Sequence, residues 1–306
     1  MWEYIWKRIL MLIPVALGAT FVVFALIHIA PGDPVDLMLG EMASQDAVDE
    51  MRQELGLDKP LLVQYFTWLG RLFRGNLGRS IRTHQPVSTI LRQRVPVTLE
   101  LTFSAIALAV LIGVPAGVVS AVKQYSLLDS CLMFIALFGV SMPVFWQGMM
   151  LILVFGFYFG VAPISGYGSF AHLILPTIAL GTIHAAVIAR LTRSSMLECQ
   201  RLDYVRTARS KGLRERRIVT RHVLRNALLP LVTIIGLRIP NIFGGAVITE
   251  TVFGRVGMGR TIVQAIFNRD FPVLQGCVLL LALLVIISNL FVDITYAFLD
   301  PRIQYD

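Results

Sequence analysis

The stretch TLELTFSAIALAVLIGVPAGVVSAV, residues 98–122, contains one ionisable side chain, that of Glu100. A helix of roughly 20 apolar residues crosses a hydrocarbon core about 30 Å thick, and this stretch is long enough to do so. Five further stretches are nearly uncharged: residues 9–30, 132–160, 173–189, 228–249 and 276–299. The shortest of them, 173–189, lies near the lower limit of about 17 residues for a span. The pattern predicts six membrane-spanning helices.

The overall composition agrees with a membrane protein. Of the 306 residues, 56% are hydrophobic and 15% are charged, and the mean hydropathy is +0.72. Soluble domains have about a quarter of their residues charged. The first apolar stretch follows Lys7 and Arg8, as in a signal peptide, but it is longer than the apolar region of about 7–15 residues that signal peptides have. We interpret it as a retained helix and expect an all-α integral membrane protein.

Basic residues are concentrated on one side of the predicted bundle. The segment 190–225 holds 11 basic and three acidic residues, whereas in the segment 31–97 eight basic residues balance eight acidic ones. Loops rich in Lys and Arg stay in the cytoplasm, so 190–225 is predicted to be cytoplasmic, and six spans place both termini on that side. Nucleic-acid binding is not favoured, because the segment contains no nucleic-acid module and Tyr204 is its one aromatic residue.

This orientation divides the chain into four parts. They are the N-terminus with the first span (1–30), an extracytoplasmic segment (31–97), a membrane core with a cytoplasmic loop at 193–228 (98–300) and a cytoplasmic tail (301–306).

The extracytoplasmic segment has the pattern of two helices. Ser44 is a candidate N-cap for a helix that ends near Gly56, and Pro60 opens a second helix. On the second helix, apolar residues recur at spacings of three and four and form one stripe: Leu61, Tyr65, Trp68, Leu69, Leu72 and Phe73. The stripe packs on the outer ends of membrane helices or lies in the headgroup interface. The segment acts as a structural lid, as a platform for an external partner, or as both.

The pattern of the cytoplasmic segment predicts a short, rigid helical projection, which we call the knob. Asp203 is a candidate N-cap for a short helix over 204–211, and Gly212 is placed to end that helix. A second amphipathic helix, over about 214–228, leads into the next span at Pro230. A short helix held firmly between two membrane helices transmits a push, whereas a slack loop does not.

Two stretches of this segment, DYVRTARSKGL at 203–213 and RHVLRNALLP at 221–230, resemble the cytoplasmic EAA loop of ABC importer permeases, in the version of the dipeptide/oligopeptide/nickel class. The loop departs from the general motif at Arg206 and Thr207, which replace Glu and the first Ala, and in its late proline; both departures are expected of the peptide class. Other landmarks extend the resemblance over nearly the whole chain: PGDPV at 31–35, LGLDKP at 55–60, SMP at 141–143, ARLTRSS at 189–195, TETVF at 249–253 and GMGR at 257–260.

The resemblance implies a channel-forming subunit of an ATP-driven importer in the bacterial plasma (inner) membrane. It implies as partners a second, related permease, two ABC ATPase subunits and an extracytoplasmic solute-binding protein. In such importers the short cytoplasmic helix docks in a cleft of the ATPase, and ATP with Mg²⁺ is bound there. The chain itself is then not an enzyme and binds no cofactor. Consistent with this, no lysine follows a glycine as a Walker A loop requires; the four lysines are Lys7, Lys59, Lys123 and Lys211.

The resemblance also assigns the ATPase-coupling residues, with Gly212 as the strongest candidate: Asp203, Tyr204, Arg206, Thr207, Ala208, Arg209, Lys211, Gly212 and Leu213. No catalytic residue is expected. The three cysteines (131, 199 and 277) and the histidines at 28, 172 and 184 show no metal-ligand spacing, so no metal site is expected.

Four residues are candidates for the translocation pathway. Arg238 lies well inside the fifth stretch. A charge at the bilayer centre costs about 3 kcal/mol, so Arg238 either meets a solute carboxylate or pairs with an acid such as Glu100. Glu250, near the outer end of the same stretch, marks an external gate or caps the loop that follows. Ser141 and Pro143 lie within the third stretch, and Pro143 is expected to kink it.

Two other classes of protein share some of these features. A secondary transporter or channel that works without an ATPase is the alternative function, but we find no inverted repeat of the kind such transporters carry. An intramembrane enzyme is disfavoured because the sequence lacks His-Glu-x-x-His and Gly-x-Ser-x-Gly. The solute stays open among dipeptides, longer peptides, glutathione and nickel chelates.

Overall fold

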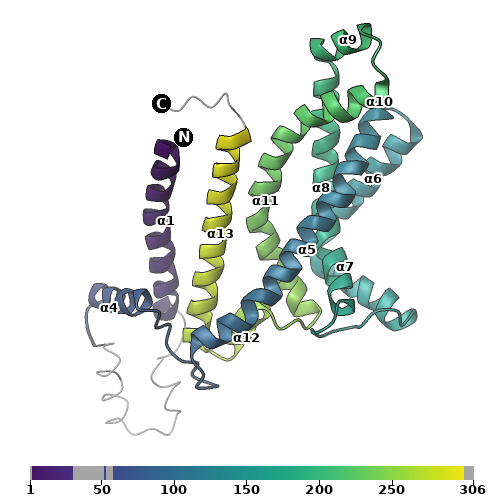
Figure 1. Cartoon of the computed structure of the whole chain (residues 1–306). Coiled ribbons are helices and arrows are strands. Elements are labelled where there is room, and N and C mark those ends of the chain that lie inside the picture. The colour runs from purple at the N-terminus through teal and green to yellow at the C-terminus, as the bar shows by residue number, and fades with distance from the viewer. Residues whose placement is uncertain (1, 30–51, 53–57, 300–306) are drawn as a thin grey trace.

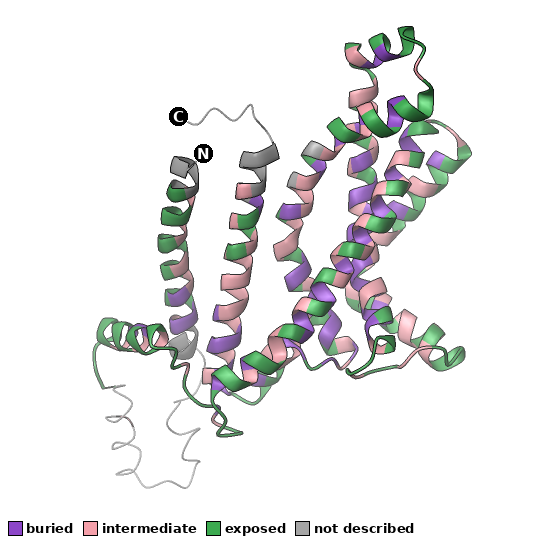
Figure 2. Ribbon diagram, viewed as in Figure 1, coloured by how far each residue is buried: buried purple, intermediate pink, exposed green. Residues whose placement is uncertain are grey.

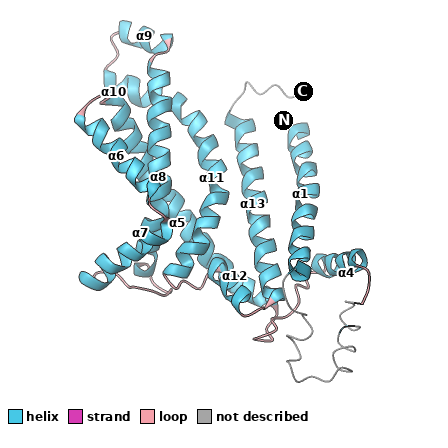
Figure 3. Cartoon of the chain, turned by 180° about the vertical axis from the view of Figure 1, so that it is seen from behind, coloured by secondary structure: helices cyan, strands magenta, loops and turns pink. Residues whose placement is uncertain are grey.

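The computed structural model describes residues 2–29, 52 and 58–299. Throughout these ranges the regular elements are helices (Figures 1 and 3), which confirms the all-α fold. The helix predicted before Gly56 and the C-terminal tail lie outside the described residues.

Five helices are long and apolar enough to cross a membrane. They correspond to five of the six predicted stretches and comprise α1 (Trp2–Ile29), α5 (Val87–Val122), α8 (Ala171–Gln200), α11 (Leu224–Val252) and α13 (Phe271–Leu299). Many of their side chains are exposed (Figure 2), and these include large apolar ones such as Phe103 and Leu111. An apolar exterior of this kind suits a lipid or protein environment better than water.

The third predicted stretch is not a single kinked helix. It consists of α6 (Leu127–Ser141) and α7 (Val144–Leu151), which continues as the π-helical segment η1 (Ile152–Tyr158), and the two parts are bent by 104°. Met142 has extended backbone angles between them, since the ring of Pro143 disfavours a helical residue before it. The bend at Pro143 is therefore much larger than the kink that we expected. The pair forms a broken span or a re-entrant segment.

Helices α5 and α8 form the centre of the bundle through small side chains. A Cβ atom added at Gly113 of α5 would lie 2.6 Å from the carbonyl oxygen of Ala185 on α8. Ala105 and Ala109 of α5 and Ala189 of α8 are also buried. Small residues let helix backbones approach closely, as is common between membrane helices.

Helix α1 packs along α13, away from this centre (Figure 1). The Gln275 side chain of α13 donates a hydrogen bond of 3.2 Å to the carbonyl of Val23 on α1. The helix predicted after Pro60 is α4 (Leu61–Phe73), and its Tyr65 and Leu69 pack against Phe24 of α1.

The molecule has two distinct ends. The start of α1 and the end of α13 lie at the same end as the short helix α9 (Asp203–Ser210), whereas α4 and α12 (Met258–Phe267) lie at the opposite end (Figure 1). We call these the α9 end and the α4 end.

Candidate functional site

The candidate coupling site is α9 with the turn that follows it. Asp203 is the first residue of α9, and Leu202 occupies the N-cap position with no side-chain hydrogen bond. The prediction that Asp203 caps the helix is therefore wrong by one residue. A carboxylate in the first turn still favours the helix, because it faces the positive end of the helix dipole. The Asp203 carboxylate also lies 3.7 Å from the guanidinium of Arg206.

Gly212 ends α9 as predicted. Its φ is +74°, a conformation that glycine adopts without the steric cost that a Cβ imposes. The Gly212 N–H donates to the carbonyl of Arg209 at 2.9 Å, and the Leu213 N–H donates to that of Ala208 at 3.3 Å. This pair of bonds is the Schellman arrangement, which satisfies the last carbonyls of a helix.

One face of α9 is anchored in a hydrophobic cluster. Val205 and Ala208 are buried against Ala121 of α5, Met196 of α8 and Ile218, which begins the π-helical segment η2 (Ile218–Val223). Tyr204 and Leu213 are half-buried at the edge of this cluster, and burial raises the pKa of Tyr204. The helix is thus fixed to the ends of two membrane helices. Of the predicted coupling residues, Ala208 faces this cluster and supports the knob from inside.

The opposite face of α9 is exposed and basic. Arg209 donates to Glu215 at 2.7 Å across the turn, and this bond lowers the pKa of the Glu215 carboxyl. The pair holds the turn from the solvent side. The exposed members of the predicted coupling set are Asp203, Arg206, Thr207, Arg209, Lys211 and Gly212.

The helix predicted over 214–228 is not separate from the fifth span. The short helix α10 (Glu215–Arg217) continues through η2 directly into α11, and Pro230 lies inside α11. The sequence marked Pro230 as a boundary, but the chain stays helical on both sides of it. The coupling segment therefore joins α11 without a hinge of irregular backbone.

The break between α6 and α7 forms an apolar hollow. Ser141 ends α6 and Pro143 is the N-cap of α7, and both are exposed. An open groove of about 390 Å³ lies beside them, lined by Phe138, Ser141, Met142, Pro143, Phe145 and Trp146. Two of the four predicted pathway residues thus share one site.

Arg238 lies on α11 and is partly buried. Among the described residues no acid pairs with it. Its suggested partner Glu100 instead binds Arg255, at 2.9 Å. The suggested pairing is wrong because Glu100 lies at the level of the last turns of α11, two residues after Thr98, which binds Glu250. Arg238 precedes Arg255 by some 17 residues in the chain. Each helical residue adds roughly 1.5 Å along the axis of α11, so Arg238 lies far from the level of Glu100.

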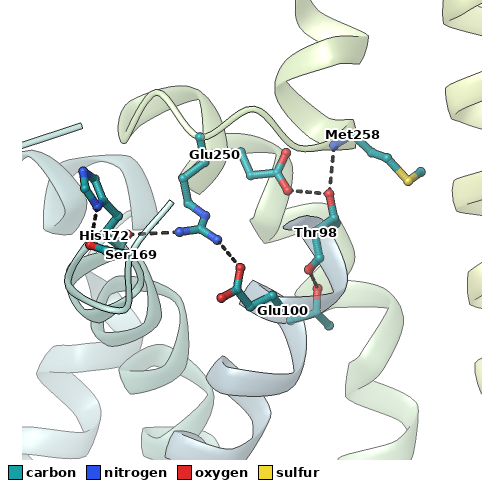
Figure 4. Close-up of polar contacts among 8 residues, drawn as sticks. Thr98, Glu100, Ser169, His172, Glu250 and Met258 are labelled. Carbon is teal, nitrogen blue, oxygen red and sulfur yellow. Dashed lines mark hydrogen bonds and ion pairs between the residues drawn. The ribbon is translucent and has the colours of Figure 1, made fainter. Parts of the chain in front are cut away.

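Glu250 is fully buried at the α4 end and serves as a cap (Figure 4). Its carboxylate accepts hydrogen bonds from the Thr98 hydroxyl of α5 at 2.6 Å and from the Arg260 backbone N–H of α12 at 3.1 Å. Thr98 in turn accepts from the N–H of Met258. The carboxylate thus binds the N-terminus of α12, as the capping alternative for Glu250 predicts.

Sequence reasoning missed an ion pair that joins α6 to α8. The Arg193 guanidinium binds the buried carboxylate of Asp129 through two contacts of 2.8 Å, and Ser120 of α5 also donates to Asp129. A signal was available, because Ser126 is a good N-cap and its side chain accepts from the Asp129 N–H. The partner could not be read from the sequence. Arg193 lies in the last part of α8, the helix that leads to α9. The ion pair therefore fixes the base of the coupling segment.

None of these clusters is a metal site. Among the described residues, no group of three or more His, Cys, Asp or Glu side chains is placed to hold a metal ion.

Comparison with known proteins identifies a family. Residues 113–305 match the family described as binding-protein-dependent transport system inner membrane component, and residues 1–102 match the N-terminal region of such membrane components. The chain is 44% identical to a dipeptide transport system permease protein, DppB, of Alkalihalophilus pseudofirmus, with all of both chains covered. It is 42% identical to the DppB of Escherichia coli, over 100% of this chain and 99% of that one. It is also 42% identical to an oligopeptide transport system permease protein, AppB, of Bacillus subtilis, over 99% of each.

Solved structures show the same fold. A structure of the MetNI methionine ABC transporter in an inward-facing conformation matches with a TM-score of 0.61 and 21% identity, over 70% of this chain and 97% of that one. An amino acid ABC transporter matches with a TM-score of 0.52 and 17% identity, over 71% and 95%. About 70% of the chain is therefore folded as in the matched ABC transporter chains.

Proposed function

Because this chain belongs to the family of binding-protein-dependent transport inner-membrane components, we propose that it is the channel-forming subunit of an ABC importer that carries dipeptides or short oligopeptides. The solute class follows the dipeptide and oligopeptide permeases to which the chain is similar. As a family member it is a multi-pass protein of the bacterial inner membrane.

The observation that carries the proposal is α9. Its exposed basic face, rigid glycine turn and anchorage on α5 and α8 suit a helix that docks in a cleft of an ATPase. Movement of the docked helix reaches α8 and η2 through the cluster that anchors α9, and η2 continues into α11 without an irregular segment. Two ATPase subunits supply the ATP hydrolysis, and a second, related permease completes the channel.

The proposed topology has six spans with both termini in the cytoplasm. The bent pair α6 and α7 counts as the third span, and the α9 end, where α1 begins and α13 ends (Figure 1), is cytoplasmic. An extracytoplasmic binding protein delivers the peptide to the α4 end. The hollow at Ser141 and Pro143 contributes to the path, and Arg238, which has no acidic partner within the described residues, meets the carboxylate of the peptide.

Uptake by vesicles tests this function. The full transporter, purified from its native membrane, is placed in vesicles with ATP inside and the binding protein with a radiolabelled dipeptide outside. We expect uptake that requires both ATP and the binding protein. Uptake driven by an ion gradient without ATP would instead establish the alternative, a secondary transporter. Uptake of another solute but not of peptides would leave the importer in place and refute the peptide assignment.

A further inference from the structure

Helix α4 carries an apolar face that the described part of the chain leaves open. Leu62 and Phe66 are each 65% exposed, and Phe73 is 80% exposed. At 3.6 residues per turn these three side chains fall within one narrow arc of the helix. The arc adjoins the face through which Tyr65 and Leu69 pack on α1. The apolar surface of α4 therefore extends beyond the stripe predicted from the sequence, which included Phe73 but not Leu62 or Phe66.

The contacts of α4 with α1 fix its depth. The Tyr65 hydroxyl hydrogen-bonds the Thr20 hydroxyl at 2.8 Å, and the rings of Tyr65 and Phe24 lie 5.5 Å apart. The apolar span of α1 runs from Arg8 to Ala25, so α4 crosses α1 within the last two turns of that span. Figure 1 shows α4 lying across the axis of α1 at the end remote from α9. In a bilayer whose hydrocarbon core matches this span, α4 lies where hydrocarbon gives way to lipid headgroups.

The residues of α4 match that boundary. Gln64, Thr67 and Arg71 lie on the side opposite the exposed apolar arc, and Arg74 follows the last turn. Tyr and Trp are enriched where membranes meet water, and α4 holds both, in Tyr65 and Trp68. Arginine side chains near such a surface are attracted to lipid phosphates. An amphipathic helix with this distribution lies in the plane of the interface.

We propose that α4 is an interfacial helix whose Leu62, Phe66 and Phe73 insert among the lipids of the leaflet at the α4 end. Arg71 and Arg74 then lie among the lipid phosphate groups. Since α4 is bonded to α1, and α1 packs on α13, the helix sets how deeply this pair of spans sits in the bilayer. The occupant of the exposed arc is lipid, and not a neighbouring subunit.

Site-directed spin labelling of two adjacent residues tests this proposal. Phe66 and Thr67 are both exposed but point to different sides of α4. Phe66→Cys and Thr67→Cys are introduced separately into a chain carrying Cys131→Ser and Cys199→Ser, since Cys277 is buried. The labelled full transporter is placed in vesicles of phosphatidylethanolamine and phosphatidylglycerol. Collisions of each nitroxide with oxygen, which concentrates in lipid, and with a water-soluble nickel chelate are then measured.

The proposal predicts that oxygen collisions exceed nickel collisions at position 66 and that the order reverses at position 67. Position 67 is the matched control, because a label there reports on the same helix in the same sample. Equal access of the nickel chelate to both positions would place α4 in water and overturn the proposal. Protection of position 66 from both reagents would show that a protein partner covers it, which would also overturn the proposal.

Discussion

At the scale of single residues, Arg255 links several elements at the α4 end. It is 1% exposed, and its guanidinium donates to Glu100 at 2.9 Å and to the carbonyl of His172 at 3.0 Å. It also lies 5.2 Å from the centre of the Tyr167 ring. One side chain thus joins the turn after α11 to α5 and to the start of α8. The Glu100 side chain is 41% exposed, so water solvates part of this pair.

We expect Arg255→Leu to destabilise the protein by about 1–3 kcal/mol, because it leaves the carboxylate of Glu100 and the carbonyl of His172 without their donor. This loss of stability is smaller than the roughly 3–5 kcal/mol that breaking a fully buried ion pair costs, because Glu100 is partly solvated. The midpoint of thermal unfolding in lipid nanodiscs measures the change. Arg92→Leu, at an exposed position of the same α5 helix end, is the control and should change the midpoint little. Equal effects of the two substitutions would refute this role of Arg255.

The Arg209–Glu215 pair makes the coupling turn sensitive to acid. The bond lowers the pKa of Glu215 below its ordinary value of 4.5, so its contribution is complete above that value and is lost as the pH falls through the lowered pKa. Both side chains are about half exposed, which limits the contribution to a few tenths of a kcal/mol, roughly.

Amide hydrogen exchange in the coupling turn should therefore be faster in Glu215→Gln than in the native protein at pH 7. The difference should shrink when both are compared at a pH well below 4.5. A difference that stays constant with pH would show that the carboxylate charge has no part in holding the turn.

At the scale of elements, the close contact of α5 with α8 is the main packing feature of the described bundle. A Cβ atom at Gly113 would meet the Ala185 carbonyl oxygen at 2.6 Å and the Ile188 side chain at 2.9 Å. The helix backbones must then separate, because a carbonyl oxygen of a helix cannot turn away. Overpacking of this kind costs typically about 1–3 kcal/mol.

Gly113→Ala should accordingly lower the thermal midpoint and the yield of assembled transporter. Gly244→Ala is a matched control, because Gly244 also lies in a membrane helix but has no atom within 4 Å of an added Cβ. If Gly244→Ala were as harmful as Gly113→Ala, the loss would come from the backbone effect of the glycine and not from the helix contact.

The elements themselves were predictable where their signal is local. Uncharged length identified α1, α5, α8, α11 and α13, because a membrane requires about 20 such residues. The same signal could not reveal the bend of α6 against α7, since hydropathy records apolar length and not direction. The Gly113–Gly117 pair, a glycine spacing of four in an apolar stretch, was a usable sign of the α5–α8 contact. The Asp129–Arg193 pair depends on tertiary packing and could not be paired from the sequence.

At the scale of the whole molecule, the fold places α9 at one end of the bundle and α12, whose N-terminus Glu250 binds, at the other (Figures 1 and 4). The sequence located the coupling helix and its terminal glycine, because helix-ending signals are local. It could not tell which residues of that helix face outward, and Ala208 proved to be buried. Membership of the transport family explains why a rigid, exposed knob is fixed to the membrane helices, as an ATPase partner requires.

The most direct test identifies the proteins that co-purify with the tagged chain from its native membrane when the tip of the coupling segment is changed. Gly212 has φ +74° and Gly160, in the turn after η1, has φ +60°, and neither has an atom within 4 Å of an added Cβ. Gly212→Asp and Gly160→Asp therefore impose the same backbone strain, of about 1–2 kcal/mol, and the same added charge. Only the first lies on the proposed docking surface.

We predict that the native chain and Gly160→Asp retain the ATPase subunits and the second permease. Gly212→Asp should lose the ATPases while keeping the second permease, which shows that the variant is folded. Retention of the ATPases by Gly212→Asp at the native level, or purification of the native chain without any ATPase, would contradict the coupling role of α9.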